Sequence, residues 1–140
     1  MEIQKLKKED FPVVNIHEQE PYIRFYASGK IVLNKSAVSH LRLLSENGWG
    51  GVSFYHDARN PAEISISGDI NGWQVRPGTG GGCIFNNRNL ARHVIDLMWG
   101  KVARPAGDTS PKPGHCSFHI ARLPIDDVVH KNIFCLIRKK

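Results

Sequence analysis

The sequence predicts an α+β fold in which a curved, mostly antiparallel β-sheet carries two helices packed on one face. Two observations lead to this prediction. Short segments with the two-residue period of β-strands are separated by glycine-containing turns along much of the chain. Two longer segments, one after Asn34 and one after Asn86 or Asn87, instead space their apolar residues as amphipathic helices do.

The first elements predict a β-hairpin followed by a helix. Residues 22–27 alternate in the strand period, Ser28-Gly29 makes a tight turn, and residues 30–34 form the return strand. Asn34 is placed to cap the helix, and residues 45–51 end it. The buried stripe of this helix is expected to comprise Val38, Leu41 and Leu44.

The rest of the chain predicts more strands and a second helix, which ends near Trp99. Its buried stripe comprises Leu90, Val94, Leu97 and Met98. Residues 133–137 are apolar on both faces, which is typical of a central strand or of a strand buried at a subunit contact. Because an open sheet and such a strand need cover, we expect a homodimer. The remaining strands are expected at residues 52–56, 63–67, 73–76, 83–85 and 116–123.

The chain of 140 residues is long enough for one domain with an arm. We assign residues 1–20 to a polar N-terminal arm and residues 21–140 to a single α+β domain, with a core at 21–99 and C-terminal strands within 115–138. The arm lacks the apolar stretch of a signal peptide, and the longest apolar run has five residues, too few to cross a membrane. We therefore expect a cytoplasmic protein, nucleoid-associated or, in a eukaryote, nuclear.

The charge balance points to a polyanionic partner. Nineteen Lys and Arg oppose thirteen Asp and Glu, which gives a net charge of +6. Such an excess concentrates polyanions around a protein, and nucleic acid is the commonest of them. The alternative is a soluble basic protein whose charge has no specific partner.

The cysteines and histidines predict neither a metal site nor a cofactor. Cys83, Cys116 and Cys135 are odd in number and form no Cys-x-x-Cys pair, which indicates free thiols in a reducing compartment. His115 and His119 are expected on one face of a strand with Cys116 on the other, so the three do not converge on one ion.

Two stretches of the chain are similar to one another at an offset of 52 residues. Residues 29–38 and residues 81–90 each contain a glycine turn, a short apolar strand, an asparagine and the start of an amphipathic helix. Each asparagine ends its strand and accepts hydrogen bonds from the first amides of the helix. This similarity indicates either a duplicated unit or a common junction that occurs twice by coincidence.

Residues 21–99 resemble Whirly, Pur-alpha and positive-cofactor-type modules. The resemblance rests on Gly29-Lys30-Ile31-Val32-Leu33-Asn34-Lys35 and on residues 81–97. Those modules are curved antiparallel sheets that bind single-stranded nucleic acid, usually as dimers or tandem repeats, and the resemblance implies the same here. The chain departs from them in having two strands before its first helix and extra strands after Trp99.

A second resemblance covers residues 22–67. The stretch Gly29 to Lys35, followed by an amphipathic turn and by Gly50-Gly51-Val52-Ser53-Phe54, is similar to AbrB-like swapped-hairpin DNA binders. Those proteins also dimerise, but they bind duplex DNA, so this resemblance implies a duplex DNA-binding regulator.

The candidate binding residues centre on one strand face. Tyr22, Arg24 and Tyr26 share that face, where the rings offer stacking surfaces to bases and the arginine neutralises phosphate. The alternative is that both tyrosines pack beneath other segments and that Arg24 pairs with an acid. The expected neighbours on the sheet are Lys30, Tyr55, Gln74 and Arg76, and Lys35 and Arg88 lie near helix starts that favour anions.

These observations predict a non-catalytic nucleic-acid-binding protein that prefers single-stranded DNA or RNA. The sequence has no catalytic motif of high specificity, and residues 78–82 lack the Lys-Ser/Thr of a phosphate-binding loop. Two alternatives stay open beside the AbrB-like reading. They are a small ribonuclease that uses His115 or His119 to carry protons, and a protein-interaction module.

Overall fold

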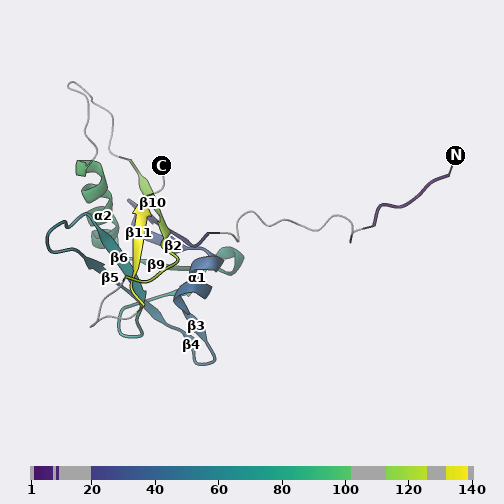
Figure 1. The fold of residues 1–140 in the computed structure, drawn as a ribbon, viewed down its shortest axis with the longest axis horizontal. Coiled ribbons are helices and arrows are strands. Elements are labelled where there is room, and N and C mark those ends of the chain that lie inside the picture. Colours follow the sequence, from purple (N-terminus) through teal and green to yellow (C-terminus); the bar gives the residue numbers. More distant parts are fainter. Residues whose placement is uncertain (1, 8, 10–19, 102–112, 126–131, 139–140) are drawn as a thin grey trace, which may run out of the picture.

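A computed structural model of the chain describes residues 2–7, 9, 20–101, 113–125 and 132–138. Of the predicted arm, residues 10–19 lie outside the described part, and residues 2–7 form neither helix nor strand. The described chain contains one large antiparallel sheet, one small hairpin, two α-helices and a short 3-10 turn (Figure 1). The predicted α+β class is therefore confirmed.

The large sheet has nine strands in the order β7-β5-β6-β11-β10-β1-β2-β9-β8. All of its neighbouring strands run antiparallel. The strands are β1 (Tyr22–Tyr26), β2 (Lys30–Leu33), β5 (Gly51–His56), β6 (Ile64–Gly68), β7 (Trp73–Gln74), β8 (Arg76–Pro77), β9 (Cys83–Asn86), β10 (His115–Ile120) and β11 (Phe134–Arg138). The small hairpin pairs β3 (Leu44–Ser45) with β4 (Gly48–Trp49).

The two edges of the large sheet meet in one segment, so that the sheet is nearly closed. Strands β7 and β8 are separated only by Val75; β7 pairs with β5, whereas β8 pairs with β9. The Trp73 ring centroid lies 5.6 Å from that of Phe54 on β5 and 6.4 Å from that of Phe85 on β9. Closure leaves little unpaired strand edge exposed.

The core lies inside this curved sheet. Along β1, Ile23 and Phe25 are fully buried, while Tyr22, Arg24 and Tyr26, which alternate with them, are half-buried. The Phe25 ring contacts the rings of Phe54 and Phe118 at centroid distances of 5.8 and 5.7 Å. Strand residues with the period of two therefore send one set of side chains inward, as the sequence predicted.

Both helices add their apolar faces to this same core, which places them on one side of the sheet. Helix α1 (Lys35–Leu41) buries Ala37, Val38 and Leu41, and α2 (Arg88–Lys101) buries Ala91, Val94, Ile95 and Met98. The helices lie apart in Figure 1, with strands between them. The asparagine caps are as predicted: Asn34 accepts from the Ala37 N–H at 2.9 Å, and Asn87 accepts from the Leu90 N–H at 2.9 Å.

The first helix is shorter than the sequence pattern indicated. We predicted Leu44 on its buried stripe, but Leu44 is 55% exposed and belongs to β3. The helix stops because Arg42 adopts a left-handed conformation, with φ of 54°. The Arg42 N–H bonds to Ser39 O and the Leu43 N–H to Val38 O, which is the Schellman arrangement.

The C-terminal strands complete the sheet. Strand β11 lies between β6 and β10, which confirms the central position that its apolar faces indicated. Strand β10 ends at Ile120, three residues before the predicted end. Because the sheet is nearly closed, the open edge that led us to expect a homodimer is reduced to short unpaired stretches among the described strands, so the dimer stays a prediction with less support from that edge.

Strand pairing shows that the sequence similarity at offset 52 reflects a structural duplication. The pair Arg24↔Val32 of β1–β2 corresponds to the pair Arg76↔Ile84 of β8–β9, and Val32 also pairs with Ile84, its own counterpart. Adding 52 to both residue numbers of the pair 24–32 gives the pair 76–84, so one constant offset relates the two hairpins.

The later strands repeat with a second constant offset, of 68 residues. Val52↔Gly68 of β5–β6 corresponds to Ile120↔Leu136 of β10–β11. Ile66 pairs with Phe134, again its own counterpart. We call the nearly closed sheet the barrel. Its first half comprises β1, β2, α1, β5 and β6, and its second half comprises β7–β8, β9, α2, β10 and β11. The two halves are related by a pseudo-twofold axis that passes through the β2–β9 and β6–β11 contacts.

Candidate functional site

The predicted face of β1 is on the outside of the sheet. Tyr22, Arg24 and Tyr26 are half-buried there and alternate with the fully buried Ile23 and Phe25. Neither tyrosine is shut away beneath other described segments, and Arg24 has no acidic partner among the described residues.

Arg24 is positioned by neighbours on its own strand and on β10. Its Nε donates to Ser117 Oγ at 2.7 Å, and Nη1 donates to the Tyr26 hydroxyl at 3.4 Å. Its guanidinium carbon lies 6.0 Å from the centre of the Tyr22 ring. Because a guanidinium carries five N–H donors, these two bonds leave donors for an anion.

A second arginine lies in the same cross-strand row. Register places Arg24, Val32, Ile84 and Arg76 side by side on β1, β2, β9 and β8. Three strand spacings of about 4.8 Å separate the two arginine backbones by about 14 Å. Arg76 is exposed, and the pseudo-twofold axis relates it to Arg24.

Lys30 extends this row of cations along the hairpin. It is exposed on β2, pairs with Asn86 of β9, and follows the turn that begins after Tyr26. The six adjacent strands β8, β9, β2, β1, β10 and β11 contain no Asp or Glu. We call Tyr22, Arg24, Tyr26, Lys30 and Arg76 the outer face.

Of the other predicted binding residues, Tyr55, Lys35 and Arg88 lie on elements other than the strands of the outer face, whereas Gln74 shares the exposed side of its segment with Arg76 but has its amide hydrogen-bonded. Tyr55 lies on β5, four strands away, with its hydroxyl 3.1 Å from Ser67 Oγ. The Gln74 amide donates to Ile70 O at 2.7 Å, although Gln74 is two residues from Arg76. Lys35 is the first residue of α1, and the carbons of its side chain lie beside Gly81. Arg88 is the first residue of α2, and its backbone lies beside Gly29 in the turn between β1 and β2.

Sequence reasoning missed the contribution of β10 to the outer face. His119 and His115 lie opposite Tyr22 and Tyr26, and the His115 and Tyr26 ring centroids are 6.0 Å apart. The His119 Nδ1 atom is buried and has no hydrogen-bond partner. Alternation along residues 115–120 indicated their shared face, but only the fold reveals that β10 pairs with β1.

Among the described residues, the two histidines of β10 lie far apart and two of the cysteines are buried. Four residues of a strand separate His115 from His119 by about 13 Å, which is too far for both to act on one phosphate. Burial raises the pKa of the Cys83 thiol to about 12 and that of Cys116 to about 11, so neither is a ready nucleophile. Across the described ranges, no three His, Cys, Asp or Glu are grouped to hold a metal ion.

Two general findings complete this description, one on membrane-spanning helices and one on similarity to known proteins. In the described part of the chain, neither helix is long and apolar enough to cross a membrane. Comparison with family models, with curated proteins and with solved structures finds no match to this chain.

Proposed function

We propose that this chain binds nucleic acid on its outer face, without catalysis, and prefers single strands. One observation carries the proposal: a continuous stretch of six strands presents Arg24, Lys30 and Arg76 with no Asp or Glu, and two half-buried tyrosines flank Arg24. Cationic grooves with interspersed aromatic rings bind single strands with little dependence on sequence.

The parts of the outer face have separate roles in this proposal. Arg24, Lys30 and Arg76 neutralise phosphates, while Tyr22 and Tyr26 stack on bases. The 14 Å between the arginine backbones corresponds to about four nucleotides at the 3.4 Å rise of a stacked strand. We therefore expect a site of at least about four nucleotides, the lower end of the range for comparable folds.

Duplex DNA is the second candidate, and a different observation favours it. The pseudo-twofold axis relates Arg24 to Arg76, and a duplex has such a dyad whereas a single strand has none. The hairpin β1–β2 of the first half also lies between β10 and β9 of the second half. This interleaving of hairpins suits the AbrB-like alternative, which implies a duplex DNA-binding regulator.

A titration with labelled single-stranded and duplex oligonucleotides tests the proposal. Tyr22→Ala and Tyr26→Ala should each weaken single-strand binding by about 1–3 kcal/mol, the usual value for a stacked base. Tyr55→Ala is the matched control, because it removes the same ring from a distant strand.

The outcomes separate the candidates. Stronger duplex binding that the tyrosine variants do not change would favour the AbrB-like alternative. Absence of binding to either form, or equal losses in all three tyrosine variants, would refute the outer face as the site.

A further inference from the structure

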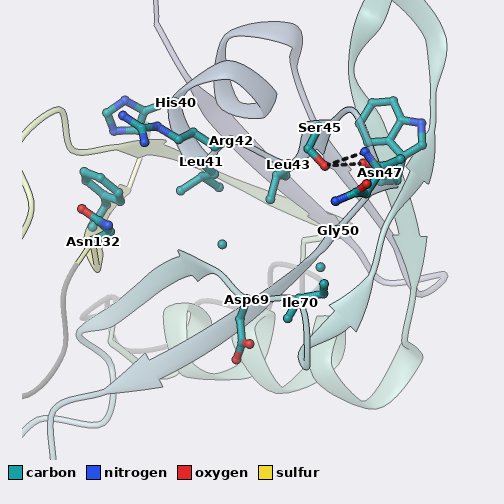
Figure 2. Close-up of a pocket in the computed structure, with 15 residues that line it drawn as sticks. His40, Leu41, Arg42, Leu43, Ser45, Asn47, Gly50, Asp69, Ile70 and Asn132 are labelled. Atoms are coloured by element: carbon teal, nitrogen blue, oxygen red, sulfur yellow. Dashed lines mark hydrogen bonds between the residues drawn. The ribbon is translucent and has the colours of Figure 1, made fainter.

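A cavity of about 460 Å³ lies at the end of α1, on parts of the fold that contribute nothing to the outer face. The end of α1, the β3–β4 hairpin, the turn after β6 and the start of β11 form its walls. A cavity of this size suits a small organic molecule. Figure 2 shows Leu41 and Leu43 directed toward the space between His40, Arg42 and Asn132 on one side and Ser45 and Asn47 on the other.

The duplication explains why there is space at this position. The helix caps match at an offset of 53, Asn34 with Asn87, so Leu41 at the end of α1 corresponds to Val94, but α2 continues for seven more residues to Lys101. In the first half, the chain instead turns away at Arg42 into the β3–β4 hairpin. The cavity therefore lies where the second half has two further helical turns.

Arg42 lines the cavity and has a backbone conformation that is unusual for an arginine. It occupies the left-handed position that ends a helix, where glycine is the usual residue because it has no Cβ. Arg42 and Asn132, with φ of 54° and 63°, are the non-glycine residues with positive φ in the described chain, and both line this cavity. Residues held in this conformation gather at functional sites.

The charges and rings around the cavity define the ligand that fits it. Within the described chain, the exposed Arg42 side chain makes no hydrogen bond or ion pair. The Asp69 carboxylate, on the facing wall, accepts from Ser53 Oγ at 2.7 Å and from the Asn71 N–H at 2.9 Å. These bonds lower the pKa of Asp69 and keep it ionised, so a phosphate is favoured at the Arg42 wall and disfavoured beside Asp69. Trp49 is half-buried in the lining and supplies an aromatic surface.

We propose that this cavity binds a nucleotide, with the phosphate at Arg42 and the base against Trp49. A guanidinium recognises phosphate through charge-assisted hydrogen bonds, and a base stacks on an indole irrespective of its identity. The nucleotide is either a free mononucleotide or the phosphorylated end of a strand, since both present the same two groups. This site shares no residue with the outer face, so the result of a test on one site does not decide the other.

Calorimetric titration of the full chain with adenosine 5′-monophosphate, adenosine, inorganic phosphate and a 5′-phosphorylated dinucleotide tests the proposal. Arg42→Gly is the decisive variant, because glycine suits the left-handed position and should leave the melting temperature unchanged or raise it. It should weaken nucleotide binding about tenfold to a hundredfold. Arg59→Ala, which removes the same charge from an exposed loop, should bind like the unmodified chain.

Each outcome decides the proposal. Binding of the mononucleotide with loss in Arg42→Gly supports it and identifies the free nucleotide as the source. Binding of the dinucleotide alone, with the same loss, supports it and identifies a strand end. Binding of neither, equal binding by Arg42→Gly, or adenosine and phosphate each binding as well as the nucleotide would overturn it.

Discussion

The salt dependence of binding tests the outer face most directly, because each phosphate contact contributes a fixed slope. If Arg24, Lys30 and Arg76 each neutralise one phosphate, the slope of log K against log salt for a single strand is about −2.1, at about −0.7 per contact. The association constant should then fall about 18-fold between 50 and 200 mM salt. Arg76→Ala removes one contact, so the slope should become about −1.4 and the fall about sevenfold.

Arg24→Ala should change the slope by the same amount but should differ in its effect on stability. Arg24 donates to Ser117, which is 9% exposed, so its removal leaves a nearly buried hydroxyl without this bond. The loss of such a bond costs about 1 kcal/mol. Arg76 is exposed and makes no side-chain hydrogen bond or ion pair in the described chain, so Arg76→Ala should leave stability unchanged.

Fluorescence anisotropy with a short labelled oligothymidylate, measured at several salt concentrations, gives the slope, and thermal unfolding gives the stability. Arg59→Ala is the control for net charge, since its loop lies outside the outer face. A slope equal to that of the unmodified chain in both arginine variants would refute the assignment. An equally large change of the salt slope in Arg59→Ala would also refute the assignment.

Three further predictions concern stability and thiol chemistry. Gly82→Ala should lower the free energy of unfolding in urea by more than about 2 kcal/mol, because the Cβ of the new alanine would lie 2.3 Å from Leu33 O. Gly100→Ala is the control, because a Cβ there has open space in a helix, and it should leave stability unchanged or raise it. Because burial raises the pKa of Cys83 to about 12 and of Cys116 to about 11, from 9.0, the stability these thiols contribute is complete below pH 9 and should decline as pH rises toward 11–12. A thiol reagent at pH 8 should label the exposed Cys135 at once and the two buried thiols only on unfolding.

Local patterns in the sequence were sufficient to predict what depends on neighbouring residues. The period of two placed Tyr22, Arg24 and Tyr26 on one face, and the asparagines marked both helix starts. The similarity of residues 29–38 to residues 81–90 left a duplicated unit and a coincidence as alternatives, and strand register now favours the duplication.

Features that depend on distant pairing were beyond the reach of these patterns. Nothing local indicates that residues 73–77 join both edges of the sheet, or that β10 pairs with β1 ninety residues earlier in the chain. Tyr55 was grouped with Tyr22 on the assumption that their strands align, whereas the fold places β5 on another part of the barrel. The end of α1 was missed because its left-handed terminal residue is an arginine instead of the usual glycine.

The way in which the two halves differ bears on the choice between single strands and duplexes. The offset of 52 relates Arg24 to Arg76, so arginines that we propose to contact phosphate are present in both halves. The same offset relates Tyr22 to Gln74 and Lys30 to Gly82, so stacking ring and lysine are present in one half only. A duplex that contacts both halves equally gains nothing from this asymmetry, because its two strands are related by a dyad. A single strand has a direction, so a face with rings at one end and only a cation at the other would favour one orientation of a bound strand, and this asymmetry fits the proposed single-strand binding better than duplex binding.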